Sequence, residues 1–313
     1  MAVHALVDHF ARFFTTLNPS ATFERRASSE HHAITALIES RTGPAAALGP
    51  HCFLQGSYRQ DTAIYTINDV DIVALCRAWF PGTPAPGAVE WSRNDIFNAV
   101  ASAIAADARY ADKVHYGPTS TVIHVDLDIK VEVLPVVYRG GISDPNSEPF
   151  VLYRPERARW EAGYAREHQR QLSLKNSALL AGGKFKPMVK VLKHLRSLHG
   201  VEAVSFHLEC LLYSLPPIVF IGGPADYITN VLTAIALRPA DAWYQQLVMT
   251  PCGDRDIFTQ DEWTYSSWVT FHGAVQRWLL AAGYATNAQS KADAIEAWRL
   301  VLGDNYFPRT VTT

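Results

Sequence analysis

Two short stretches decide how this chain folds: LQGSY at residues 54–58 and DVDIV at residues 69–73. The second stretch would form a buried strand except at its two aspartates. Side chains at positions i and i+2 of a strand point to the same face, so Asp69 and Asp71 present two carboxylates together while the intervening apolar residues face the core. The alternative is that Asp69 simply ends a loop, which is common for an aspartate at a strand edge.

The carboxylates of Asp69 and Asp71 would repel each other, because like charges side by side disfavour ionisation of both. A divalent cation removes this cost, and Mg²⁺ prefers a site of few carboxylates completed by substrate phosphates. The preceding Gly56-Ser57 turn fits such a phosphate. Gly56 leaves room for a close approach, and consecutive backbone N–H groups with the Ser57 hydroxyl form a concave anion site. Without the acidic pair, this turn would indicate only the end of a strand.

A third carboxylate is expected in the stretch HVDLDIKVEVLP at residues 124–135, which we interpret as one alternating strand. Its polar face would carry Asp126, Asp128, Lys130 and Glu132, so any of three acids could complete the site. Two-metal sites hold their ions about 3.5–4 Å apart, with one ion activating the attacking oxygen and both stabilising the phosphoryl group. A solvated polar face is the alternative for at least two of these acids.

The composition is that of an ordinary globular chain. Its 313 residues are 48% hydrophobic and 19% charged, with a formal net charge of -2, which fits one or two domains with a large core. This charge argues against coating of long nucleic acid, and small charged ligands fit better. We expect no membrane span and a cytoplasmic protein. Four widely spaced cysteines lack metal-site spacing and are expected to be buried and reduced: Cys52, Cys76, Cys210 and Cys252.

The apolar periodicity predicts an α+β protein. Helical spacing at residues 6–17 predicts a first helix, and Ser28 or Ser29 could cap a second. Stretches rich in Val, Ile and Leu predict strands at 52–55, 70–75 and 121–137. A loop at 81–87 and a crossing helix at 96–108 would connect them.

From Arg157 onward the periodicity is mainly helical. It predicts helices at 185–198, 204–215, 225–236, 263–282 and 292–301. We therefore expect two domains, joined in the loop at 140–149. Residues 1–150 would hold the N-terminal helices and the catalytic core, and residues 151–313 a helical domain.

These residues resemble a known superfamily. Gly56-Ser57, the DVDI stretch and an acid within VEVLP at residues 131–135 look like the DNA polymerase β-like nucleotidyltransferases. More narrowly, the chain resembles the bacterial cyclic-oligonucleotide synthases (SMODS-type CD-NTases), which are related to animal cyclic GMP-AMP synthase and oligoadenylate synthetase. The narrower resemblance extends from about residue 50 to residue 308 and rests on further segments: Thr62-Ala63-Ile64, residues 187–194, SFHLE at 205–209, and residues 298–308.

The resemblance implies a polymerase β-like core, a mixed sheet flanked by helices, followed by a C-terminal helical domain like that of oligoadenylate synthetase. It implies two Mg²⁺ ions, with Mn²⁺ as a substitute, held by Asp69, Asp71 and a third acid. The family usually has Asp three residues before the strand-ending proline. Here that position is Glu132, whose longer side chain can still reach a metal, and Asp128 remains the alternative.

The donor nucleotide is expected to contact four residues: Gly56, Ser57, Lys193 and Ser205. Three lysines lie on one face of the predicted helix, and lysines in such a pattern are usually solvated. The resemblance implies a phosphate contact only for Lys193, so Lys186 and Lys190 are expected to be solvated. Taken by itself, Ser205 would be a helix N-cap.

The resemblance implies an enzyme that joins nucleoside triphosphates (ATP, GTP, CTP or UTP) into a cyclic di- or trinucleotide second messenger. A ribose hydroxyl would attack an α-phosphate and release pyrophosphate, in antiphage (CBASS-type) signalling. We expect a monomer that binds neither nucleic acid stably nor a membrane. Regulatory proteins encoded in the same defence operon are possible partners. Two alternatives remain: a nucleotidyltransferase modifying RNA, protein or a small molecule, and a nucleotide-binding regulator without catalysis. The intact acid pair disfavours the regulator, and the charge balance disfavours an RNA substrate.

Overall fold

The computed structural model describes residues 1–77, 91–138, 149–154 and 159–311. The chain forms two compact units, which we call the sheet unit (residues 19–61 and 66–169) and the helical unit (residues 1–18, 62–65 and 170–313). These units interleave along the chain, whereas the expected domains 1–150 and 151–313 are consecutive. The loop predicted at 81–87 lies outside the described residues, as does nearly all of the loop predicted at 140–149.

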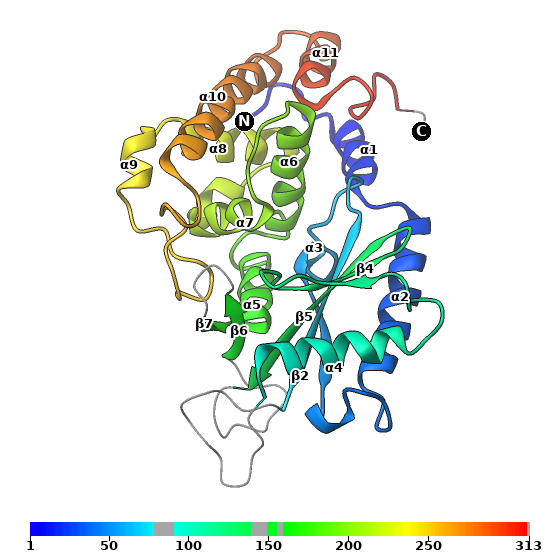
Figure 1. Ribbon diagram of the computed structural model, residues 1–313. Helices are drawn as coiled ribbons and strands as arrows, with labels where there is room; N and C mark the ends of the chain where they lie inside the picture. The colour runs from blue at the N-terminus through cyan, green and yellow to red at the C-terminus, as the bar shows by residue number, and fades with distance from the viewer. Residues whose placement is uncertain (78–90, 139–148, 155–158, 312–313) are drawn as a thin grey trace. The chain divides into compact units, whose positions relative to one another are not determined.

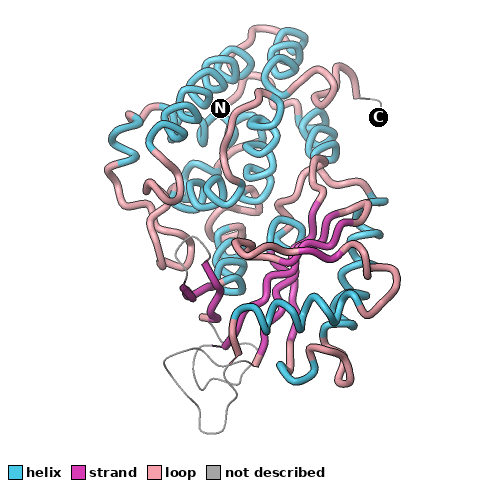
Figure 2. Tube along the Cα trace, viewed as in Figure 1, coloured by secondary structure: helices cyan, strands magenta, loops and turns pink. Residues whose placement is uncertain are grey.

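The sheet unit is built on a mixed seven-stranded sheet, shown in magenta in Figure 2. The parallel pair β2 (Asp69–Cys76) and β5 (Lys130–Tyr138) forms its centre. β1 (His51–Gln55) pairs antiparallel with β2, and β4 (Ile123–Asp126) pairs antiparallel with β5. The sheet is extended by β3 (Val114–His115), β6 (Phe150–Arg154) and β7 (Arg159–Gly163). The mixed sheet confirms the predicted α+β class.

Two helices cover one face of this sheet, α2 (Ala21–Ile38) and α4 (Arg93–Ala105) (Figure 1). Ile34 of α2 and Phe97 of α4 are fully buried and pack in one cluster with Ile72 of β2 and Val131 of β5. Parallel neighbours such as β2 and β5 cannot be joined by a tight turn, so the chain between them crosses over and includes α4. A further helix of the unit, α3 (Gly56–Gln60), directly follows β1.

The start of α2 differs from the prediction. The helix is capped by Ser20, whose side chain accepts a hydrogen bond from the Phe23 N–H at 3.1 Å, while Ser28 and Ser29 lie inside the helix. The buried residues of α2 begin only at Ala27. Its first turns contain few apolar residues, so the apolar periodicity from which the helix was predicted is missing there.

Two segments of the sheet also differ from the prediction. Residues 124–135 form a hairpin instead of one strand, because β4 ends at Asp126 and β5 begins at Lys130. Asp126 and Lys130 are register partners, so the alternation continues in phase through the turn and does not reveal it. The helical character expected from Arg157 is wrong for β7, which pairs antiparallel with β6.

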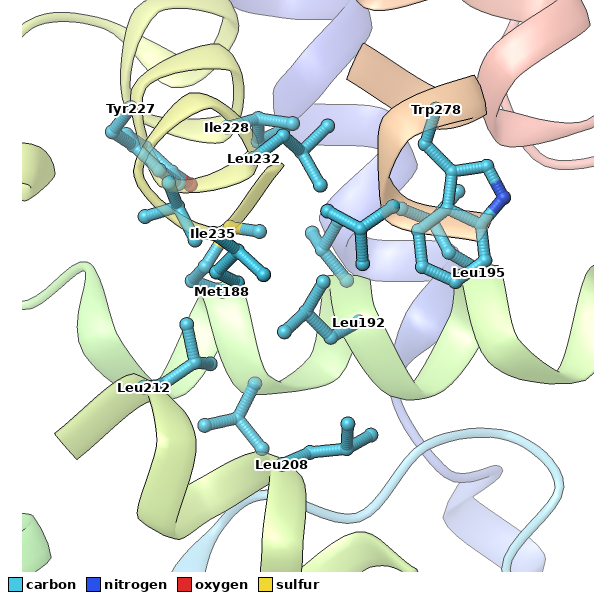
Figure 3. Packing of buried hydrophobic residues seen from close by; sticks show 14 of the residues in the cluster. Met188, Leu192, Leu195, Leu208, Leu212, Tyr227, Ile228, Leu232, Ile235 and Trp278 are labelled. Carbon is cyan, nitrogen blue, oxygen red and sulfur yellow. The ribbon is translucent and has the colours of Figure 1, made fainter. Parts of the chain in front are cut away.

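The helical unit confirms the predicted helices within a few residues. It contains α6 (Phe185–Leu198), α7 (Ser205–Ser214), α8 (Pro224–Ala236), α9 (Ala240–Tyr244), α10 (Tyr265–Thr286) and α11 (Lys291–Leu302). α5 (Ala165–Lys175) contributes its C-terminal part. Figure 3 shows apolar side chains of α6, α7 and α8 packed together, among them Leu192, Leu208 and Leu232, which are fully buried.

The first helix, α1 (Val7–Leu17), belongs to the helical unit and packs on α6 and α8. Phe10 and Phe13 are fully buried, and the Phe10 ring meets the Trp298 indole edge-on at 5.1 Å. All four cysteines are free, and all but the half-buried Cys252 are buried. Within the described ranges, none of the helices is long and apolar enough to cross a membrane.

Candidate active site

The acidic pair lies at the start of β2, as predicted. Val70 and Ile72 are buried against the helix-covered face, so Asp69 and Asp71 point to the opposite face. Farther along β2 that opposite face is apolar again, because Val73 and Leu75 pack with residues of β5 and β6. The carboxylates therefore occupy the polar end of an otherwise buried strand.

The strand register places Glu132 beside Asp71. The two residues are partners in the parallel β2–β5 pair, and Glu132 is in turn the partner of His124 on β4. On the outer strands, Gln55 of β1 is the partner of Asp71, and His115 of β3 is the partner of His124. These five residues form a row of polar side chains across the sheet. Glu132 thus lies in the centre of this polar row, which crosses five strands, and of the three predicted acids it is the one next to Asp71.

The pKa of Asp71 shows that these carboxylates interact. Burial raises it most, and the charges of Asp69 and Glu132 raise it further, to about 7 from an ordinary 3.8. In the described part of the chain, no three His, Cys, Asp or Glu side chains are already gathered into a metal-binding cluster. The set of three carboxylates on neighbouring strand positions nevertheless fits a divalent cation, because hard cations prefer oxygen ligands and would relieve this repulsion.

The absence of a side chain at Gly56 leaves room for the Asp71 carboxylate. Gly56 opens α3 with φ +71°, and a Cβ at this position would collide with the Asp71 carboxylate. A glycine is therefore required both by the backbone conformation and by the close approach of the acid. Ser57 follows as the second residue of α3, so the Gly-Ser pair and the carboxylates come together in the sheet unit.

The other two candidate acids are not members of this row. Asp128 is in the turn between β4 and β5, where it is 78% exposed and accepts a hydrogen bond from Arg26 at 2.9 Å. Asp126 is the register partner of Lys130, and Lys130 is in turn the partner of Asp69. The Asp126 carboxylate lies 3.7 Å from the His115 ring nitrogen Nε2. Both surroundings match the solvated face that was the alternative for these acids.

Lys193 and Ser205 belong to the helical unit, whereas the carboxylates belong to the sheet unit. Lys193 is buried, and its ammonium donates to Glu209 at 2.9 Å and to the carbonyl oxygen of Thr62 at 3.1 Å. Ser205 is the first residue of α7, and Arg196 donates to its hydroxyl at 3.3 Å. The N-cap is Val204 instead, which corrects the expectation for Ser205 as a cap.

Sequence reasoning missed two histidines in the polar row. His124 Nδ1 lies 3.5 Å from the Glu132 carboxylate, and the His115 and His124 rings stack at 5.4 Å. His124 shares its strand face with Asp126, so the alternation of residues 124–135 contained the signal.

A mixed sheet with acids on neighbouring strands, preceded by a Gly-Ser helix, is typical of nucleotidyltransferases with a polymerase β-like core. The comparison with known families narrows this class. Residues 4–176 match the Second Messenger Oligonucleotide or Dinucleotide Synthetase (SMODS) domain, and the chain belongs to this family.

Individual relatives agree with this assignment. Cyclic UMP-AMP synthase from Rhodothermus marinus is 26% identical over 226 residues, which cover 66% of this chain and 76% of the relative. The solved structure of Rhodothermus marinus CdnE c-UMP-AMP synthase with Apcpp and Upnpp has a TM-score of 0.68 at 22% identity, covering 92% and 99% of the two chains. Vibrio cholerae DncV cyclic AMP-GMP synthase, solved with the linear intermediate 5′ pppA(3′,5′)pG, gives a TM-score of 0.62 at 14% identity, covering 85% of this chain and 72% of that one. These structures confirm the predicted fold.

Proposed function

We propose that this enzyme joins free nucleoside triphosphates into a cyclic di- or trinucleotide, using Asp69, Asp71 and Glu132 as its catalytic acids. The observation that carries the proposal is the register of β2 and β5, which sets Glu132 directly beside Asp71. Family membership supports the product class, and the near-neutral charge of the chain supports free nucleotides over a nucleic-acid primer.

The three acids would hold two Mg²⁺ ions, or Mn²⁺ in their place. Bound there, the ions supply positive charge that activates the attacking hydroxyl and stabilises the phosphoryl group. The Asp71 carboxylate, whose pKa is about 7, has to lose its proton before it can take part. Gly56 and Ser57 would bind phosphate oxygens of the donor through their N–H groups and the hydroxyl, close to the Asp71 carboxylate that Gly56 accommodates.

In the reaction, the ribose hydroxyl of one nucleotide attacks the α-phosphorus of the donor and pyrophosphate leaves. The linear intermediate then stays bound, and its free ribose hydroxyl attacks its own 5′-terminal α-phosphorus, which releases a second pyrophosphate and closes the ring. Tethering favours this second step, because an intramolecular acceptor has a high effective concentration. The DncV complex is with such a linear species, which supports a two-step course for this chain. We further propose a cytoplasmic, monomeric enzyme that signals in antiphage defence.

Product analysis tests the proposal. The protein is incubated with each pair of the four triphosphates and Mg²⁺, the mixture is treated with phosphatase, and the remaining species are weighed by mass spectrometry. We expect a phosphatase-resistant species whose mass equals whole nucleoside monophosphates minus one water each. Exclusively phosphatase-sensitive linear products, or turnover that requires added RNA, would instead indicate a transferase acting on another acceptor. The double variant Asp69→Asn/Asp71→Asn controls for contaminating enzymes.

A further inference from the structure

Glu132 lies between an acid and a histidine. Its register partner on β2 is Asp71 and its register partner on β4 is His124, so the three side chains are neighbours on one face of the sheet. The charge of Glu132 contributes to the raised pKa of Asp71, which indicates that the two carboxylates repel each other. This repulsion favours positions of the Glu132 carboxylate on the side of His124.

His124 is placed to hold that carboxylate. Its Nδ1 lies 3.5 Å from Glu132 Oε1, and the two side chains are 34% and 31% exposed, so solvent screens the contact only in part. An ionised carboxylate can only accept a hydrogen bond, so the facing Nδ1 is the donor. The distance is slightly longer than a hydrogen bond, and contacts of this kind commonly tighten when substrate binds. Within the described ranges, no lysine or arginine forms an ion pair with Glu132.

The position of His124 is fixed from its other side. β4 lies between β3 and β5, and His115 is the β3 partner of His124. The two imidazole rings stack with their centres 5.4 Å apart and their planes at 23°. His115 Nε2 in turn lies 3.7 Å from the carboxylate of Asp126, on the strand that carries His124. His124 is therefore a ring on a paired strand, held against a second ring.

Glu132 needs such a contact more than the two aspartates do. A glutamate has one more rotatable bond than an aspartate, so fixing its carboxylate costs more conformational entropy. A divalent cation requires its carboxylate ligands in a defined arrangement. A neighbour that fixes a ligand in advance therefore raises the affinity for the cation, and loss of such a neighbour commonly costs about 10–100-fold in affinity or activity.

We propose that His124 is a positioning residue that holds the Glu132 carboxylate in the orientation required to bind a divalent cation. The imidazole acts through Glu132 and does not itself bind the cation. This inference rests on the proposed function, because it requires Glu132 to be a metal ligand. The effect of His124 should therefore depend on the length of the side chain at position 132.

Binding of Mn²⁺ tests this role without turnover. The protein is titrated with Mn²⁺ and the free ion is measured by electron paramagnetic resonance, with kcat at limiting and at saturating Mg²⁺ as a second readout. We expect His124→Phe, which keeps an aromatic ring against His115, to weaken Mn²⁺ binding at least ~10-fold and to recover most of its kcat at saturating Mg²⁺. His124→Asn should stay within about threefold of the wild type, because its amide can donate from nearly the position of Nδ1.

His51→Phe is the matched control. His51 Nδ1 also lies 3.5 Å from a glutamate oxygen, that of Glu39, but this pair is outside the polar row. The variant loses a comparable histidine–glutamate contact and should bind Mn²⁺ like the wild type. Equal weakening in His51→Phe and His124→Phe would overturn the proposal, because the loss would then come from stability and not from the orientation of Glu132. Melting temperatures verify folding, and His124→Ala replaces His124→Phe should the latter not fold.

Shortening the acid provides a second test. In a Glu132→Asp background the carboxylate is drawn back from the imidazole, so adding His124→Phe should weaken Mn²⁺ binding by less than about twofold. A loss as large as in the Glu132 background would show that the imidazole does not act through this side chain, and would overturn the proposal. Glu132→Gln separates the two levels. Unchanged Mn²⁺ binding in Glu132→Gln would refute the proposed ligand together with this inference, whereas weakened binding there and unchanged binding in His124→Phe would refute only the role of His124.

Discussion

The carboxylate of Asp71 occupies the space in which the Cβ of any residue other than glycine at position 56 would lie. The contact follows from the pairing of β1 with β2, in which Gln55, the residue before Gly56, is the register partner of Asp71. The candidate phosphate turn and the candidate metal ligand are therefore fitted to each other. A change at either position is expected to affect both.

Gly56→Ala should abolish turnover and lower stability. The new methyl group collides with Asp71, and the left-handed backbone at φ +71° adds strain. We expect a loss of about 2–4 kcal/mol in the free energy of unfolding from these two costs. Gly182→Ala is the matched control, because Gly182 has φ +58° but open space around its Cβ position. Urea denaturation of both variants separates strain from collision, and equal losses would contradict the close fit.

Asp69→Asn with Asp71→Asn should preserve the fold and lose turnover by at least ~1,000-fold, because the substitutions remove the charge that holds the cations. Both side chains are partly exposed on the polar face, so the apolar core is unaffected. Pyrophosphate release measures the activity, and circular dichroism measures the fold. Release at the wild-type rate from a folded double variant would refute the assignment of these residues.

Glu132→Gln should reduce the rate at least ~100-fold, by analogy with other groups that stabilise transition-state charge. Asp126→Asn, on the neighbouring strand, should cost little, because its register partner is Lys130 and not one of the acids. The rate of pyrophosphate release at saturating substrate distinguishes the two. Small and equal effects would show that the third ligand lies elsewhere, and Asp128→Asn would then be the next variant to measure.

The pH dependence of stability should reveal Asp71. Its folded-state pKa is about 7 against an ordinary 3.8, so between these pH values the folded protein keeps a proton that the unfolded chain has released. Stability from this group is therefore complete below about pH 4 and is lost as the pH rises through about 7. Without divalent cations, Asp71→Asn should be more stable than the wild type at pH 8, by on the order of 2–4 kcal/mol.

This advantage of Asp71→Asn should shrink as the pH falls toward 4, and thermal unfolding at several pH values measures it. Mg²⁺ at pH 8 should raise the melting temperature of the wild type and leave that of Asp71→Asn nearly unchanged. Asp128→Asn, which alters an exposed acid outside the row, is the control. An advantage of Asp71→Asn that is equal at all pH values would contradict the raised pKa.

The sequence alone predicted the sheet class and the helices of the second half, because their apolar periods are long and regular. It also predicted Asp69, Asp71 and Glu132 as site residues, although Asp126 and Asp128 remained equivalent to Glu132 by alternation. Only the register of β5 against β2 separates them, and register depends on pairing between distant segments. The hairpin at 126–130 was not predicted either. Its turn keeps the alternation of apolar and polar residues in phase, so the sequence pattern does not indicate where one strand ends and the next begins.

The surroundings of Lys193 were likewise beyond sequence reasoning. Spacing placed it with Lys186 and Lys190 on one helix face, which usually indicates solvated lysines. The structure buries Lys193 because Glu209 and Thr62 both reach it, and these partners are 16 and 131 residues away in the chain. A charge becomes tolerable inside a protein when its partners are present, and no local pattern shows that.

The interleaving of the two units has an evolutionary consequence. The chain passes from one unit to the other after residues 18, 61, 65 and 169. A single recombination break between two genes could not exchange a complete unit, because it would separate α1, with its buried Phe10 and Phe13, from the helices that cover these rings. We therefore expect the two units to be inherited together in relatives, and new nucleotide preferences to arise by point substitution within them and not by shuffling of domains.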